Sequence, residues 1–153
     1  MSRSIIESGM TFGSFVDNDL FEFIVRNGSG KPAIIFVEAK RSVPRESDLF
    51  FAEIRLKMIH ALTVWFTAVC GRQEKLNNLI PDNLKQAEHL KLPIKMCLVI
   101  PEVPDQYLIP LSDKFRQFLR AERMIWAIGY SDISVLNASR AKKYGLIGRD
   151  CIA

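Results

Sequence analysis

The hydrophobic positions of this chain form short runs rich in β-branched and aromatic residues, separated by polar segments. The runs cover 20–26, 33–37, 94–100 and 133–136, and each is bounded by Pro, Asn or charged residues. This length and composition predict β-strands. The 33–37 run is apolar on both faces, which is typical of a strand that is covered on both sides, as in the centre of an α/β sheet.

A helical pattern of hydrophobic and polar positions covers 47–71. Ser47 is a candidate N-cap and Gly71 a candidate C-terminal stop. Polar residues recur between them at intervals of three and four, which places them on one narrow stripe: Glu53, Lys57, His60, Thr63 or Val64, and Thr67. The helix is expected to pack across the sheet. Its stripe either faces solvent, with Glu53 and Lys57 as an i,i+4 pair, or faces a site near the sheet.

Further helices are expected at 111–123 and at 138–144, and a polar loop with a short helix at 73–91. Strands followed by helices favour an α/β fold, with a central mixed sheet of about four or five strands and helices on both faces. A length of 153 residues with 48% hydrophobic content suits a single domain that spans 1–153.

Net charge, cysteine spacing and the distribution of apolar residues indicate which partners and which cellular location to expect. The net charge of +4 suits an anionic partner. The three cysteines, Cys70, Cys97 and Cys151, are far apart, which predicts reduced thiols, the first two of them buried, rather than a disulfide framework or zinc site. The N-terminus lacks the pattern of a secretory signal, so a cytoplasmic location is expected. The apolar stretch 49–69 contains charged residues that a membrane-spanning helix tolerates poorly, so no membrane association is expected.

The candidate chemistry lies where the 33–37 strand ends, at Glu38-Ala39-Lys40. Residues two apart on a strand share a face, so Glu38 and Lys40 point the same way. A turn signal at 27–30 predicts that the 20–26 strand pairs with this one as a hairpin. Glu22 is an acid among large apolar residues, and burying such a group without a partner is costly. We therefore expect Glu22, or the nearby Asp19, to lie beside Glu38 and Lys40.

An acid on one strand of a hairpin, followed by Glu-x-Lys on the next, resembles the PD-(D/E)xK nuclease superfamily, also called restriction-endonuclease-like. The resemblance implies a restriction-endonuclease-like core and a Mg²⁺- or Mn²⁺-dependent nuclease that hydrolyses DNA phosphodiester bonds. Glu38 would then bind metal and Lys40 would orient the attacking water. The first metal-binding acid would be Glu22 or Asp19, although this family usually has an Asp after Pro and neither residue follows a proline.

Basic residues suggest how a nucleic acid would be held. Arg41 and Arg45 follow the Glu-x-Lys motif, and Lys142 and Lys143 lie in the last expected helix, where they could contact phosphates. The resemblance also allows a homodimer, because duplex cleavage often uses two active sites. The alternative is a nuclease-fold protein that has lost catalysis and serves as a nucleic-acid-binding or assembly subunit. In a third hypothesis, Glu38 simply pairs with Lys40 at the surface.

Overall fold

The computed structural model describes residues 6–7, 10–15, 21–26, 33–80, 82 and 85–146; for the first three ranges it describes the strand backbone. These residues form a six-stranded sheet in which spatial order follows chain order. Its first four strands pair antiparallel and the last two continue parallel to the fourth. The strands are β1 (Ile6–Glu7), β2 (Met10–Phe15), β3 (Phe21–Arg26), β4 (Ile34–Ala39), β5 (Ile94–Val99) and β6 (Ile133–Leu136).

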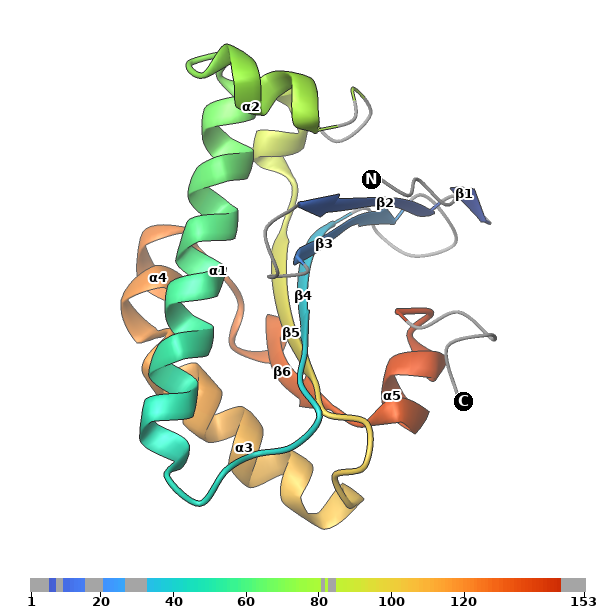
Figure 1. Cartoon of the computed structure of the whole chain (residues 1–153), viewed down its shortest axis with the longest axis vertical. Coiled ribbons are helices and arrows are strands. Elements are labelled where there is room, and N and C mark those ends of the chain that lie inside the picture. The colour runs from blue at the N-terminus through green and yellow to red at the C-terminus, as the bar shows by residue number, and fades with distance from the viewer. Residues whose placement is uncertain are drawn as a thin grey trace.

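Helices connect the parallel strands and cover both faces of the sheet. Between β4 and β5 lie α1 (Ser47–Val69), α2 (Glu74–Leu79) and the 3₁₀ helix η2 (Ala87–Lys91). Between β5 and β6 lie α3 (Asp105–Phe118), α4 (Arg120–Ile125) and the 3₁₀ helix η3 (Tyr130–Asp132), and α5 (Ala138–Lys143) follows β6. In Figure 1, α1, α3 and α4 lie on one side of the sheet and α5 lies on the other. Parallel neighbours require such crossover connections.

The expected mixed α/β architecture is confirmed. A mixed sheet of about four or five strands was expected. Within the described residues the parallel part of the sheet has three strands, and the antiparallel strands bring the total to six. Neither β1 nor β2 was predicted. Both lie in the N-terminal segment, where the hydrophobic runs are short and interrupted by Gly, Ser and Thr, so periodicity alone is a weak signal there.

Helix boundaries were predicted well where glycine ends the helix. Gly71 and Gly145 have φ of 66° and 70° and follow α1 and α5 directly after one capping residue. A glycine adopts this left-handed conformation without steric cost. The N-cap assignment was wrong by one residue: Glu46 occupies the N-cap position of α1, without a side-chain capping bond, and Ser47 is the first helical residue.

The start of α3 was also predicted wrongly. The helix begins at Asp105 rather than at 111, and Pro110 lies inside it. A proline removes one helical hydrogen bond and usually marks a boundary. Here burial of Leu108, four residues before the buried Ser112, holds the first turns of the helix against the protein. Tertiary packing therefore overrides the local preference.

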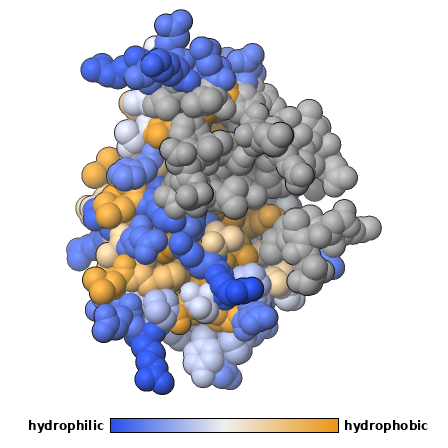
Figure 2. All heavy atoms as spheres, viewed as in Figure 1, coloured by the Kyte–Doolittle hydropathy of each residue, from blue (hydrophilic) through white to orange (hydrophobic). Residues whose placement is uncertain are grey.

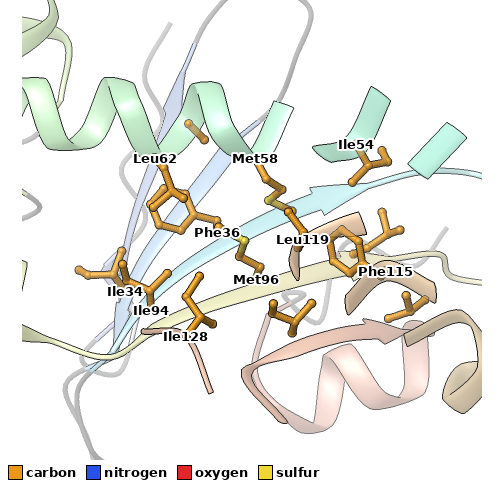
Figure 3. Packing of buried hydrophobic residues seen from close by; sticks show 14 of the residues in the cluster. Ile34, Phe36, Ile54, Met58, Leu62, Ile94, Met96, Phe115, Leu119 and Ile128 are labelled. Carbon is orange, nitrogen blue, oxygen red and sulfur yellow. The ribbon is translucent and has the colours of Figure 1, made fainter. Parts of the chain in front are cut away.

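The main core lies between the sheet and the helices α1 and α3. Figure 3 shows side chains of α1 pointing towards those of β4 and β5, with Phe115 and Leu119 completing the cluster. The labelled members from the sheet and α1 are all at most 6% exposed: Ile34, Phe36, Ile54, Met58, Leu62, Ile94 and Met96. Burial of this apolar surface is the dominant favourable contribution to folding.

A smaller cluster lies on the opposite face, around α5. Ile35 and Val37 of β4 pack there with Ala141 of α5, among other residues. Residues 34 to 37 therefore alternate between two buried clusters, which confirms that both faces of β4 are covered. The alternation places Glu38 on the α1 face, in line with Phe36 and Ile34.

Candidate functional site

Glu38 lies at the carboxyl end of β4 under α1. It is paired with Leu98 of the parallel neighbour β5, and Lys40, just beyond the strand, donates its backbone N–H to Val99 O at 2.9 Å. Only 3% of Glu38 is exposed, whereas the next residue, Ala39, faces solvent. Ligand sites of open α/β sheets usually lie at the carboxyl ends of parallel strands. The position of Glu38 is consistent with such a site.

Four charged side chains meet at this point. Glu38 Oε1 lies 3.5 Å from Lys40 Nζ and accepts a hydrogen bond from Lys57 Nζ at 3.4 Å. Glu53 Oε1 lies 3.5 Å from Lys40 Nζ and 3.8 Å from Lys57 Nζ. We call Glu38, Lys40, Glu53 and Lys57 the charge quartet. Each carboxylate contacts both ammonium groups, so the quartet joins the end of β4 to α1.

The members of the quartet differ in exposure. The exposed fraction of the side chain rises from 4% for Glu38 through 13% for Lys57 and 27% for Lys40 to 60% for Glu53. Burial raises the pKa of Glu38 above its usual value, and the charges and hydrogen bonds of Lys57 and Lys40 oppose this increase. The ion pairs of the exposed Glu53 contribute little stability, about 0 to 1 kcal/mol each.

Glu38 Oε2 is buried and has no hydrogen-bond partner among the described residues. Leaving a buried acceptor unsatisfied costs about 1 to 3 kcal/mol, and more when the group is charged. Such an atom is a natural ligand for a cation, because Mg²⁺ binds carboxylate oxygens and typically takes one or two carboxylates with waters and substrate phosphates. The donor set at Glu38 therefore fits Mg²⁺ or Mn²⁺. The described residues contain no group of three or more His, Cys, Asp and Glu side chains close enough to share a metal.

Of the two acids expected to bind the metal with Glu38, the structure describes the position of Glu22 but not that of Asp19. β3 and β4 form the expected antiparallel pair, and Glu22 is paired with Val37. Directly paired positions belong to the same face of a sheet, so position 22 belongs to the face of Val37 and not to that of Glu38. Asp19 lies outside the described residues. Metal binding by Glu22 or Asp19 remains a prediction from the sequence.

The basic residues named from the sequence lie in two places. Arg41 and Arg45 are exposed in the connection from β4 to α1. Lys142 and Lys143 are exposed on α5, which covers the opposite face of the sheet (Figure 1). The arginines and the lysines therefore lie on segments that cover different faces of the sheet (Figure 1). Only the arginines are on the segment that connects Lys40 to α1, the helix that carries Glu53 and Lys57.

Glu53 and Lys57 were not assigned to the site from the sequence. Their spacing on the polar stripe of α1 predicted an i,i+4 pair, and this pair is present. The same two side chains also face the Glu-x-Lys motif, as the second interpretation of the stripe predicted. Lys57 is 19 residues from Glu38, and no local pattern reports how closely a helix approaches a strand.

Comparison of the chain with protein-family models, with curated proteins and with solved structures gives no match. In the part of the chain that the structure describes, no helix is both long enough and apolar enough to cross a membrane.

Proposed function

We propose that this protein is a Mg²⁺-dependent nuclease that hydrolyses DNA phosphodiester bonds at Glu38 and Lys40. The observation that carries the proposal is the buried carboxylate of Glu38, with one oxygen bound by two lysines and the other without a partner among the described residues. This arrangement lies at the carboxyl end of a parallel strand and follows the Glu-x-Lys pattern of the PD-(D/E)xK nucleases.

Each residue of the motif has a role that suits its environment. Glu38 would hold the metal through a carboxylate that the fold already keeps in place. When bound, Mg²⁺ activates water and stabilises charge at the phosphate. The Lys40 ammonium, which is 27% exposed and 3.5 Å from Glu38 Oε1, orients the attacking water and balances negative charge that develops on the phosphate oxygens.

The segment after the motif supports a nucleic-acid substrate. Arg41 and Arg45 are exposed between Lys40 and α1, where their guanidinium groups can bind phosphates on either side of the cleaved bond. Lys142 and Lys143 are exposed on α5 and would contact a more distant part of the same strand or duplex. A DNA long enough to reach both faces of the sheet is the substrate that engages both pairs.

A second candidate function is nucleic-acid binding without catalysis. It is favoured by the balance of charge in the quartet, where two carboxylates face two ammonium groups and need no further cation for neutrality. In that case Glu38 and its lysines stabilise the junction of β4 and α1, and the exposed arginines carry the binding.

The two functions are separated by a cleavage assay on supercoiled plasmid, single-stranded DNA and RNA, with Mg²⁺, Mn²⁺ or EDTA. Wild type should cut DNA only with a divalent metal. Glu38→Gln and Lys40→Ala should each lower the rate about a hundredfold or more, because metal and ammonium each supply several kcal/mol of charge stabilisation. Lys75→Ala, which removes an exposed lysine of α2, serves as the matched control and should cut like wild type.

Absence of cleavage by well-folded wild-type protein on every nucleic acid would contradict the nuclease. Retention of DNA binding in the same samples, weakened by Arg41→Ala and by added salt, would then establish the binding function. Equal cleavage by wild type and Glu38→Gln would show that the activity comes from a contaminant or from another site.

A further inference from the structure

We propose that Glu53 of α1 supplies the second carboxylate for the divalent cation that Glu38 binds. The inference rests on the proposed metal site and names the acid that completes it. Glu53 is on the helix that follows the motif, whereas the sequence suggested Glu22 or Asp19, at the preceding strand of the hairpin, for this role.

The contacts of the lysines bring the two carboxylates together. Glu38 Oε1 lies 3.5 and 3.4 Å from the ammonium groups of Lys40 and Lys57, and Glu53 Oε1 lies 3.5 and 3.8 Å from the same two groups. Two carboxylates without these shared cations would repel each other. The lysines therefore hold the two carboxylates beside each other, and two is within the one or two carboxylates that Mg²⁺ typically takes from a protein.

A second and independent observation is the unpartnered oxygen of Glu38. The side chain of Glu38 is 4% exposed, and Oε2 has no hydrogen-bond partner among the described residues. Burial of an acceptor without a partner points to a ligand that the side chains of the described residues do not supply. A cation bound to Oε2 would satisfy it, whereas the lysines are already at Oε1.

Exposure gives the two acids different parts in binding. Glu38 is buried, so it anchors the ion in a fixed place. Glu53 is 60% exposed at the open side of the quartet, so it can reorient when a hydrated ion arrives from solvent. Position 22 is paired with Val37 on the other face of the sheet, which leaves Glu53 as the carboxylate that the described residues bring to Glu38.

The test is direct binding of Mn²⁺, measured by isothermal titration calorimetry and by loss of the free Mn²⁺ signal in electron paramagnetic resonance. The full chain is first treated with EDTA and desalted. Wild type should bind one ion at this site, Glu38→Gln should abolish that binding, and Glu53→Gln should raise its Kd about tenfold or more, as loss of a metal-supporting group does. Glu74→Gln, at an exposed glutamate of α2, is the matched control and should leave the Kd unchanged.

Circular dichroism of each variant verifies the fold, and Glu53→Gln should have wild-type thermal stability because Glu53 is largely exposed. The inference is overturned if Glu53→Gln binds Mn²⁺ as wild type does, or if wild type binds none. The cleavage assay run on the same samples separates the two proposals. Weakened Mn²⁺ binding in Glu53→Gln without any cleavage by wild type retains this inference and rejects the nuclease. Metal-dependent cleavage by wild type, together with unchanged Mn²⁺ binding in Glu53→Gln, retains the nuclease and rejects this inference.

Discussion

The two cysteines within the described residues have opposite environments. Cys97 lies on β5 in the smaller core cluster, with Sγ 3.8 Å from Ser134 Oγ, and burial raises its pKa to about 11. Cys70, expected to be buried as well, is exposed at the end of α1. The prediction of a buried thiol was therefore right for Cys97 and wrong for Cys70. The residues just before Cys70 are apolar, but the end of α1 extends beyond the core, so its C-cap residue is exposed. Cys151 lies outside the described residues.

Ionisation of Cys97 should lower stability in alkaline solution. An unfolded thiol titrates near the ordinary value of 9.0 and the folded one near 11, so the folded chain binds more protons between these values. The free energy of unfolding then falls as pH rises, by up to about 1.4 kcal/mol per pH unit. Urea unfolding at pH 8 to 11 should show wild type losing stability relative to Cys97→Ala. A constant difference between the two would contradict the burial of the thiol.

At the scale of elements, side chains of α3 close the outer edge of the sheet. Ser112 Oγ accepts a hydrogen bond from Val135 N at 2.9 Å, and Arg116 Nε donates to Ile133 O at 2.9 Å. These bonds occupy backbone groups of β6 that face away from β5. An uncovered edge strand can pair with another chain, so α3 both packs on the sheet and protects its edge.

An ion pair joins α1 to α4. Arg55 Nη2 donates to Glu122 Oε1 at 2.6 Å and Nε donates to Oε2 at 3.3 Å, while the Glu122 side chain is only 9% exposed. Arg55→Met should lower the free energy of unfolding by about 2 kcal/mol, because it leaves a buried carboxylate without its partner. Glu122→Gln should cost less, since Arg55 is 37% exposed and can turn to solvent.

Urea unfolding of both single variants and of the double variant measures this coupling. The double variant should be more stable than the sum of the single effects implies. Strictly additive losses would show that the pair makes no specific contribution and that the two helices are held by apolar packing alone.

At the scale of the whole molecule, the sheet separates a large core from a small one. The α1 face contains the aromatic and methionine side chains of the core, whereas the α5 face contains a smaller aliphatic cluster. Hydrophilic residues cover the end of the molecule near α2, while hydrophobic residues reach the surface beside α1 and α4 (Figure 2). Met124 and Ile125 of α4 are both exposed.

Stability should therefore depend mainly on the α1 face. Met96 is fully buried between β5 and the helices, and Met96→Ala should lower the free energy of unfolding by about 2 to 5 kcal/mol. That is a large part of the about 5 to 15 kcal/mol typical of a folded protein. Met124→Ala makes the same chemical change at a residue that is 72% exposed and should be close to neutral. Similar losses in both variants, measured by urea unfolding, would contradict this distribution of the core.

Much of the fold was predictable because it follows from local patterns. The strands β3 to β6, the helix α1 and the glycine stops after α1 and α5 each have a signal within a few consecutive residues. Elements whose local signal is weak or contradictory were missed, as with β2 and with the part of α3 before Pro110. In the site, Glu38 and Lys40 were found because they share one strand, whereas Glu53 and Lys57 come from a helix whose approach depends on packing.

The sequence by itself determined that a strand apolar on both faces ends in a glutamate and a lysine on the same side. Side-chain alternation follows from the extended backbone conformation of a strand, so it requires no knowledge of the rest of the fold. Only the tertiary structure decided which groups face Glu38. Glu22 is paired with Val37, and Lys57 donates a hydrogen bond to Glu38. Both arrangements follow from the way apolar side chains far apart in the chain pack together.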